Sequence, residues 1–171
     1  VEAMPTILPI LEEPLRDKVA AYLAKKDVVL LTGTPITGAE EGKVMFKDGT
    51  VLETDTFIWT CGVQGSSFAD SLSLQKEPNG RKGRLLADEQ MRSLDHKNVF
   101  LVGDNLWFLE ENKALPQIVE TALQTADTAA HNIAADILGK EKKAFKSNFH
   151  GFMVSVGGKY AVSNAGGMKL S

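Results

Sequence analysis

Apolar residues recur at helical and strand-like spacings in the first third of the chain. Residues 14–26 carry apolar side chains on one helical face and charged side chains on the other, which predicts a helix. The apolar run 28–31 predicts a short, buried parallel strand. Asp48-Gly49 lies between two short apolar runs and predicts a β-hairpin. Residues 56–60 predict a further strand.

The rest of the chain alternates loops, strands and one long helix. A loop-rich stretch at 63–82 suits a domain junction, and the runs 84–87 and 99–102 predict two more strands. Residues 140–143 are expected to form a solvated linker, and 151–158 the opening strand of a further small unit. The strand–helix–strand order predicts the α/β class, with parallel sheets interrupted by an antiparallel hairpin.

The long helix is predicted from Leu115 to Leu138, with Pro116 at its opening and Gly139 just past its end. Its early positions are small, which allows a neighbouring group to approach closely. The free N–H groups and the positive end of the helix dipole suit an electron-rich ring such as a reduced flavin. The alternative is an Ala-rich helix that packs tightly against a sheet.

Composition narrows the class of protein. The chain has 171 residues, 43% of them hydrophobic and 24% charged, which is typical of a globular protein. A net charge of −3 argues against nucleic acid as a partner. The single cysteine excludes an internal disulfide, and three scattered histidines do not predict a metal site. Because the chain opens at Val1-Glu2 and ends in a glycine-rich stretch, we expect an excised fragment, itself soluble.

Gly103-Asp104 follows the apolar run 99–102 directly. In open α/β sheets, ligands bind outside the carboxyl ends of strands, where a carboxylate can accept hydrogen bonds from sugar-like hydroxyls. A glycine before it lets the backbone approach the ligand. The alternative is an ordinary Gly-Asp turn. The aromatic run 107–109 either borders a ring-binding pocket or covers the core.

Glu2 and Cys61 each allow two interpretations. An acid at the end of the second strand of a dinucleotide-binding unit bonds the ribose hydroxyls, but Glu2 also suits a solvated terminus. Cys61 lacks a second thiol, so a small, buried residue at a strand end is as plausible as a redox role. No two glycines are separated by one residue, so the chain contains no Gly-x-Gly-x-x-Gly turn for a dinucleotide phosphate.

Taken together, these motifs resemble the C-terminal part of the type II NADH dehydrogenases, the flavin-dependent NADH:quinone oxidoreductases of the pyridine nucleotide-disulfide oxidoreductase superfamily. The resemblance rests on 57–63, 99–104, the helix after Pro116, and 151–158. It implies portions of two Rossmann-like FAD/NAD(P)-binding domains with a β-hairpin insertion. The segments would be 1–62 for the NADH-binding domain, 63–146 for the FAD-binding domain, and 147–171 for the start of a membrane-binding region.

The resemblance also implies cofactor-binding residues. Asp104 would bind the ribityl chain, the run 119–124 would lie at the flavin ring and quinone edge, and Glu2 would bind the NADH ribose. The full set is Glu2, Cys61, Gly62, Gly103, Asp104, Val119, Glu120, Thr121, Ala122, Leu123 and Gln124. No catalytic residue is assigned.

One departure from the family pattern falls at the flavin end of this helix. The family carries Ala-Gln-x-Ala-x-Gln where this chain has Val119-Glu120-Thr121-Ala122-Leu123-Gln124. Glu120 lacks the amide donor of glutamine. It could donate a proton to a quinone if burial raised its pKa, alter the choice of quinone, or be merely tolerated.

The whole protein is expected to pass hydride from NADH to FAD and electrons on to a membrane quinone. It would lie on the cytoplasmic side of the cell membrane, as a homo-oligomer. This chain alone is expected to self-associate, to bind neither FAD nor NADH tightly and to be inactive. A flavin reductase with a soluble acceptor, and a non-catalytic interaction module, are the alternatives.

Overall fold

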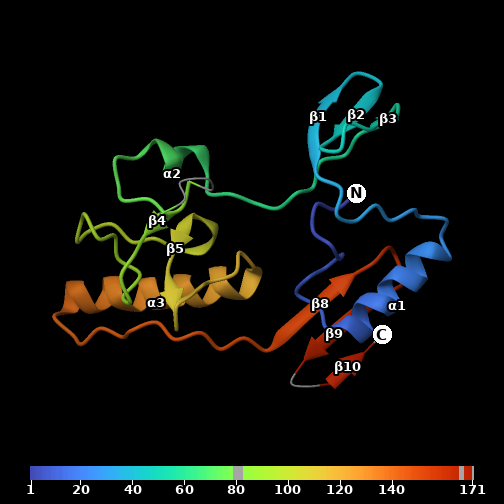
Figure 1. The fold of residues 1–171 in the computed structure, drawn as a ribbon. Helices are drawn as coiled ribbons and strands as arrows, with labels where there is room; N and C mark the ends of the chain where they lie inside the picture. Colours follow the sequence, from blue (N-terminus) through green and yellow to red (C-terminus); the bar gives the residue numbers. More distant parts are fainter. Residues whose placement is uncertain (79–82, 166–167, 171) are drawn as a thin grey trace. The chain divides into compact units, whose positions relative to one another are not determined.

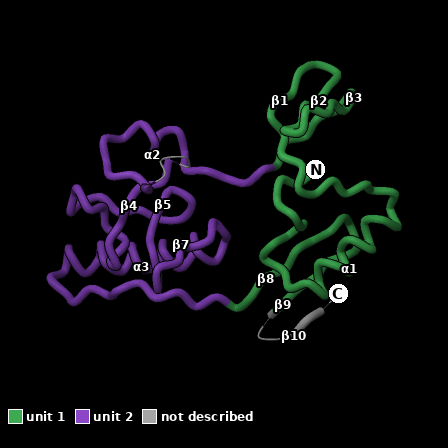
Figure 2. Tube along the Cα trace, in the orientation of Figure 1, with its two compact units in different colours: residues 1–60, 150–171 green, residues 61–149 purple. Residues whose placement is uncertain are grey.

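The computed structural model describes residues 1–78, 83–165 and 168–170, which group into two compact units. Unit 1 combines 1–60 with 150–171, and unit 2 comprises 61–149 (Figures 1 and 2). The predicted division into the domains 1–62, 63–146 and 147–171 stays a prediction. Each unit is described by itself below.

The predicted hairpin of unit 1 is confirmed as part of a three-stranded antiparallel sheet. Its strands are β1 (Ile36–Glu40), β2 (Lys43–Phe46) and β3 (Val51–Glu53), in that order. In the turn, the Asp48 carboxylate accepts hydrogen bonds from the Thr50 amide at 2.9 Å and the Thr50 hydroxyl at 2.7 Å. The strand β1 was not predicted, because its Thr, Gly and Glu residues give no apolar alternation.

The second part of unit 1 is a helix packed on a sheet. Helix α1 (Glu13–Ala24) confirms the predicted helix and has a proline in its first turn. The antiparallel sheet consists of β8 (Gly151–Ser155), β9 (Ala161–Ala165) and β10 (Met168–Leu170), and β8 confirms the strand expected there. Leu15 and Val19 of the helix share a core with Val162. Tyr22 and Tyr160 stack with ring centroids 4.2 Å apart.

Two predicted strands of unit 1 are wrong. Residues 28–31 and 56–60 form no strand, and Val29 and Ile58 are exposed rather than buried. A parallel strand needs hydrogen-bonding neighbours. The backbone hydrogen bonds described for the run 28–31 join no strand: the Val28 N–H donates to the Leu23 carbonyl at 3.1 Å, and the Leu31 carbonyl accepts from the Glu2 N–H at 2.7 Å. Within the described residues, 56–60 has no strand partner at all.

Unit 2 places short strands and loops on one long helix, α3 (Val119–Leu138). Its other elements are α2 (Ser67–Ser71), β4 (Leu85–Leu86), the 3-10 turn η1 (Gly103–Asn105), β5 (Leu106–Trp107), β6 (Leu109–Glu110) and β7 (Lys113–Ala114). Strand β4 pairs in parallel with β5, and β6 pairs antiparallel with β7. The core gathers Leu85, Met91, Leu101, Leu106 and Ala129.

The expectations for unit 2 are met in part. Of the strand predicted at 84–87, the structure has the two residues of β4. The strand predicted at 99–102 is reduced to an isolated bridge between Phe100 and Arg92. The helix begins at Val119 instead of Leu115, so Pro116 lies before it rather than in its first turn. Gly139 ends it in the left-handed conformation, with φ 66°, as predicted.

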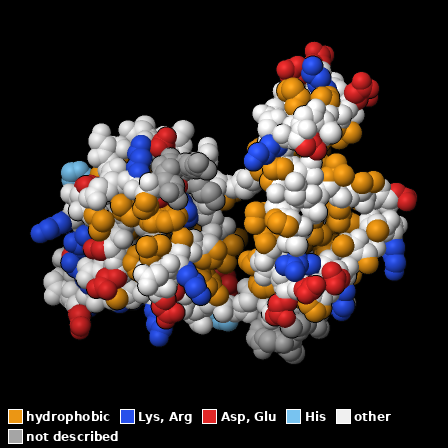
Figure 3. All heavy atoms as spheres, in the orientation of Figure 1, with side chains coloured by type: hydrophobic (Ala, Val, Ile, Leu, Met, Phe, Trp, Pro, Cys, Tyr) orange, Lys and Arg blue, Asp and Glu red, His pale blue; other side chains and the backbone are white. Residues whose placement is uncertain are grey.

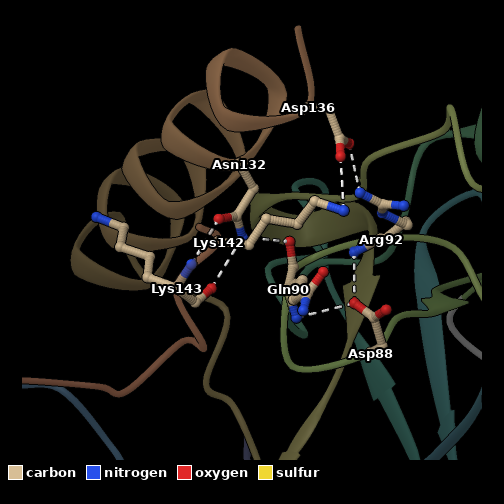
Figure 4. Close-up of polar contacts among 7 residues, drawn as sticks. All are labelled: Asp88, Gln90, Arg92, Asn132, Asp136, Lys142 and Lys143. Atoms are coloured by element: carbon tan, nitrogen blue, oxygen red, sulfur yellow. Dashed lines mark hydrogen bonds and ion pairs between the residues drawn. The ribbon is translucent and has the colours of Figure 1, made fainter. Parts of the chain in front are cut away.

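The solvated linker expected at 140–143 is present in part: Lys140 and Glu141 are exposed, whereas Lys143 is bound by Asn132 of α3. The fully buried Asn132 amide donates to the Gln90 carbonyl at 3.0 Å and to the Lys143 carbonyl at 2.9 Å. Its oxygen accepts from the Lys143 N–H at 2.9 Å (Figure 4). Asp136 pairs with Lys142 at 2.6 Å and also with Arg92. The chain after α3 therefore turns back onto the helix.

The Asp136 cluster gives the stability of unit 2 an acid dependence. The hydrogen bond from Lys142, together with the nearby Arg92 charge, holds the pKa of Asp136 below its usual range. A depressed folded-state pKa contributes stability above the unfolded pKa, and that stability is lost as pH falls through the folded pKa. We expect Asp136→Asn to be less stable than the parent by a constant margin above about pH 5, with the margin shrinking below about pH 4.

Chemical denaturation from pH 3 to pH 7 measures this margin. Lys142→Met serves as the control, because it removes the ammonium group that pairs with Asp136. In a protein that already carries Asp136→Asn, Lys142→Met should therefore lower stability by little more. A margin that is the same at pH 3 and pH 7 would contradict the expectation.

Candidate functional site

The predicted Gly-Asp motif lies against the first turns of α3. Gly103 has φ +59°, and a Cβ built there would lie 3.4 Å from the Cβ of Ala122. The Gly103 N–H donates to the Thr125 hydroxyl at 3.1 Å, and that hydroxyl donates to the Thr121 carbonyl at 2.6 Å. Glycine on the loop and small residues on the helix therefore permit a close contact. The small residues thus pack the loop onto the helix.

Asp104 is held at its backbone and exposed at its carboxylate. Its carbonyl accepts a hydrogen bond from the Gln117 side chain at 3.2 Å. Among the described residues, no hydrogen bond or ion pair involves the carboxylate, which is therefore available to a ligand. The neighbouring Asn105 accepts a hydrogen bond from the Ser66 N–H at 2.7 Å and so fixes the loop from the other side.

The first turn of α3 carries the acidic Glu120 among apolar side chains and has no side-chain cap. Ile118 at the N-cap position makes no capping hydrogen bond, and Val119 and Leu123 are largely exposed. Thr121 is buried, and its hydroxyl has no hydrogen-bond partner among the residues that the structure describes. The turn therefore offers helix N-terminal polarity next to an exposed carboxylate, which suits the polar edge of a flat, electron-rich ring.

The Gln124 side-chain amide is bound to the main chain of Asn148. Its nitrogen donates to the Asn148 carbonyl at 3.0 Å, and its oxygen accepts from the Asn148 N–H at 2.8 Å. In the aromatic run, Arg84 lies 4.2 Å from the Trp107 ring centroid and Phe108 packs edge-on against Phe145. Of its two interpretations, the structure favours the one in which this run covers the core.

Of the remaining predicted residues, Glu2 belongs to unit 1, whereas Cys61 and Gly62 belong to unit 2. Glu2, in unit 1, accepts a hydrogen bond from the Met4 N–H at 2.8 Å. Cys61 is exposed, so the alternative of a buried strand-end residue is wrong, and Gly62 follows it with φ +93°. Their roles stay predictions. Asn105 and Gln117, which fix the Gly-Asp loop, were not predicted from the sequence. Their closeness to the motif in the sequence was the signal that could have found them.

Two kinds of feature are absent from the part of the chain that the structure describes. No helix there is long and apolar enough to cross a membrane. No group of three or more His, Cys, Asp or Glu side chains there is arranged to hold a metal ion.

The residues at this junction fit one end of a flavin. An exposed carboxylate suits ribityl hydroxyls, and the uncapped helix turn suits the ring. The phosphate-binding turn of the cofactor has no counterpart in this sequence. The residues of this junction therefore fit the ribityl chain and the ring of the cofactor, and not its phosphates.

Solved structures share this fold at low sequence identity. The structure of NDH2 from Plasmodium falciparum in complex with NADH matches 99% of this chain and 50% of that chain, with a TM-score of 0.82 and 12% identity. An NAD-dependent persulfide reductase from A. fulgidus matches 96% of this chain and 30% of that chain, with a TM-score of 0.74 and 18% identity. The chain thus has the Rossmann-like fold of FAD/NAD(P)-binding oxidoreductases, as predicted.

Sequence comparison leads to the same group. The type II NADH:quinone oxidoreductase of Staphylococcus aureus (strain NCTC 8325) is 28% identical over 162 residues, which is 92% of this chain and 39% of that protein. The predicted resemblance to the type II enzymes is confirmed, and the chain spans less than half the length of these relatives. The family model for pyridine nucleotide-disulphide oxidoreductases matches residues 1–131. The chain belongs to the pyridine nucleotide-disulphide oxidoreductase family.

Proposed function

We propose that this chain supplies the ribityl- and ring-binding wall of an FAD-dependent NADH:quinone oxidoreductase. The observation that carries the proposal is the exposed Asp104 carboxylate beside the uncapped first turn of α3. The similarity to a type II NADH:quinone oxidoreductase supports the choice of substrates. FAD and NADH would serve as cofactors, and a membrane quinone would accept the electrons.

Each residue has a binding or orienting role in this proposal. Asp104 accepts hydrogen bonds from ribityl hydroxyls, and Gly103 lets the backbone approach the cofactor. The first turn of α3, from Val119 to Leu123, lies beside the ring and favours negative charge there. When bound, the flavin supplies the two-electron chemistry, while the protein binds and orients it. Glu2, Cys61 and Gly62 would contribute to NADH binding.

The test uses the protein purified as its gene encodes it. We expect a yellow protein with one FAD per chain, which NADH bleaches under anaerobic conditions and a water-soluble quinone analogue re-oxidises. A colourless protein would overturn the proposal. Flavin that is re-oxidised by a soluble protein acceptor and not by the quinone would favour the alternative of a reductase with a soluble acceptor.

An apolar stripe along α3 supports the proposal that the chain associates with other copies. Beyond the turn assigned to the flavin ring, Ile133 and Ile137 are exposed one helical turn apart, and Ile137 is 78% exposed. Near the helix end, Phe100, Ile133 and Ile137 line a hollow of about 470 Å³. Figure 3 shows apolar side chains gathered on the visible face of unit 2. Exposed apolar surface of this kind promotes association.

We expect Ile137→Lys to weaken self-association of the 171-residue chain, because a charge on the stripe must be desolvated in any apolar contact. Sedimentation velocity across a concentration series measures the change. Gln64→Lys adds the same charge at an exposed position elsewhere on unit 2 and should leave association unchanged. A chain that is monomeric at every concentration would contradict the proposal.

A further inference from the structure

The chain that follows α3 is bound along that helix by paired hydrogen bonds between helix side-chain amides and its own main chain. We call residues 143–148 the return segment; in Figure 1 it runs back alongside α3. Asn132 pairs with both main-chain groups of Lys143. Gln124, eight residues earlier on the helix, pairs in the same manner with both main-chain groups of Asn148. The return segment is thus antiparallel to α3 and is held near both of its own ends.

The two ends of the return segment differ in burial. At the first end, Asn132 is fully buried, and the buried Phe145 donates its N–H to the Glu89 carbonyl at 2.7 Å. At the second end, Asn148 is exposed, and the hydrogen bonds described for the Ser147 and Asn148 backbone come from the side chains of Glu110 and Gln124. The first end is therefore part of the core, whereas the second end is able to detach without opening the core.

The Glu110 side chain of β6 also binds this exposed end of the return segment. Glu110 of β6 accepts a hydrogen bond from the Ser147 N–H at 2.9 Å through one carboxylate oxygen and from the Ser147 hydroxyl through the other. Ser147 and Asn148 are consecutive, so β6 and α3 hold adjacent residues from two sides. We call Gln124 and Glu110, with the backbone they bind, the latch.

We propose that Gln124 and Glu110 are positioning residues that close the latch as one cooperative unit. One N–H and one oxygen lone pair of the Gln124 amide are engaged by the Asn148 main chain, so this side chain fixes the protein backbone. Gln124 is also the last residue of the run proposed to face the quinone edge of the flavin. Resting on the proposed function, the inference adds that the closed latch shapes the acceptor side of the site.

Hydrogen exchange at single-residue resolution tests the latch in the protein as its gene encodes it. Gln124→Met keeps side-chain length and helix propensity but loses both hydrogen bonds. Glu110→Ala removes the other contact. We expect either variant to accelerate exchange of both the Ser147 and the Asn148 amides by about tenfold or more, because two hydrogen bonds are lost in each. Asn148→Ala is the matched control, since the latch uses only the main chain of Asn148.

The outcomes separate the latch from simpler explanations. If Gln124→Met accelerates exchange of the Asn148 amide alone, and Glu110→Ala that of the Ser147 amide alone, the two contacts are independent and the latch is overturned. Unchanged exchange at both amides also overturns it. A faster Ser147 amide in Asn148→Ala would overturn the assignment to main-chain contacts.

Kinetics test the link to the acceptor side. We expect Glu110→Ala to raise KM for the electron acceptor several-fold while the rate of flavin reduction by NADH stays unchanged. An equal loss in both steps, or an unchanged acceptor KM, would overturn the positioning role. Failure of the proposed function is seen separately, in an unmodified protein that does not reduce quinone, and the exchange rates judge the latch in either case.

Discussion

Replacing Asn132 by alanine is expected to lower the free energy of unfolding of unit 2 by about 3 kcal/mol, because a buried hydrogen-bond network is broken. The Asn132 side chain makes three hydrogen bonds, to the Gln90 carbonyl and to both main-chain groups of Lys143. Alanine leaves these three main-chain groups without their partner and opens a cavity beside α3. Water cannot readily replace the amide, since Asn132 has no exposed surface.

Urea denaturation followed by circular dichroism measures this loss. Asn132→Asp retains the acceptor for the Lys143 N–H but loses both donors, so it should also be strongly destabilised, because it buries a carboxylate. Asn98→Ala, at an exposed position of the same unit, should change stability by less than about 0.5 kcal/mol. A variant Asn132→Ala as stable as Asn98→Ala would show that the network is dispensable.

Replacing Asp104 by alanine is expected to weaken FAD binding by about tenfold to a hundredfold in the protein as its gene encodes it. A hydrogen bond to a charged group contributes about 1.5–3 kcal/mol, and alanine removes every such bond from the ribityl chain. The structure leaves this carboxylate exposed and places it at the η1–α3 junction, while Gln117 holds only its backbone. The loop should therefore keep its conformation when the side chain is removed.

Fluorescence titration of the apoprotein with FAD gives the dissociation constants. Asp104→Asn retains an acceptor oxygen without the charge and should fall between the parent and the alanine variant. Glu111→Ala removes a carboxylate from an exposed position nearby and should bind FAD as the parent does. If Asp104→Ala bound FAD with unchanged affinity, Asp104 would have no part in holding the ribityl chain.

The sequence by itself determined the features that depend on neighbouring residues. Helix α1 follows from its apolar spacing and its proline, and the hairpin turn follows from Asp48-Gly49. The end of α3 follows from Gly139, which adopts the left-handed conformation that favours glycine. The position of Gly103-Asp104 between an extended segment and a long helix was likewise predictable, because the motif and the run before it are contiguous.

Only the tertiary structure decided the features that join distant residues. The runs 28–31 and 56–60 have strand-like sequences, yet a strand forms only where another strand accepts its hydrogen bonds. Residues 140–143 have a linker-like composition, yet Asn132 and Asp136 of α3 bind the last two of them. Gln124 carries the residue type expected at a cofactor, yet its amide is bound to Asn148. Polar side chains bind whichever partner the folded chain brings near, and sequence order alone does not specify that partner.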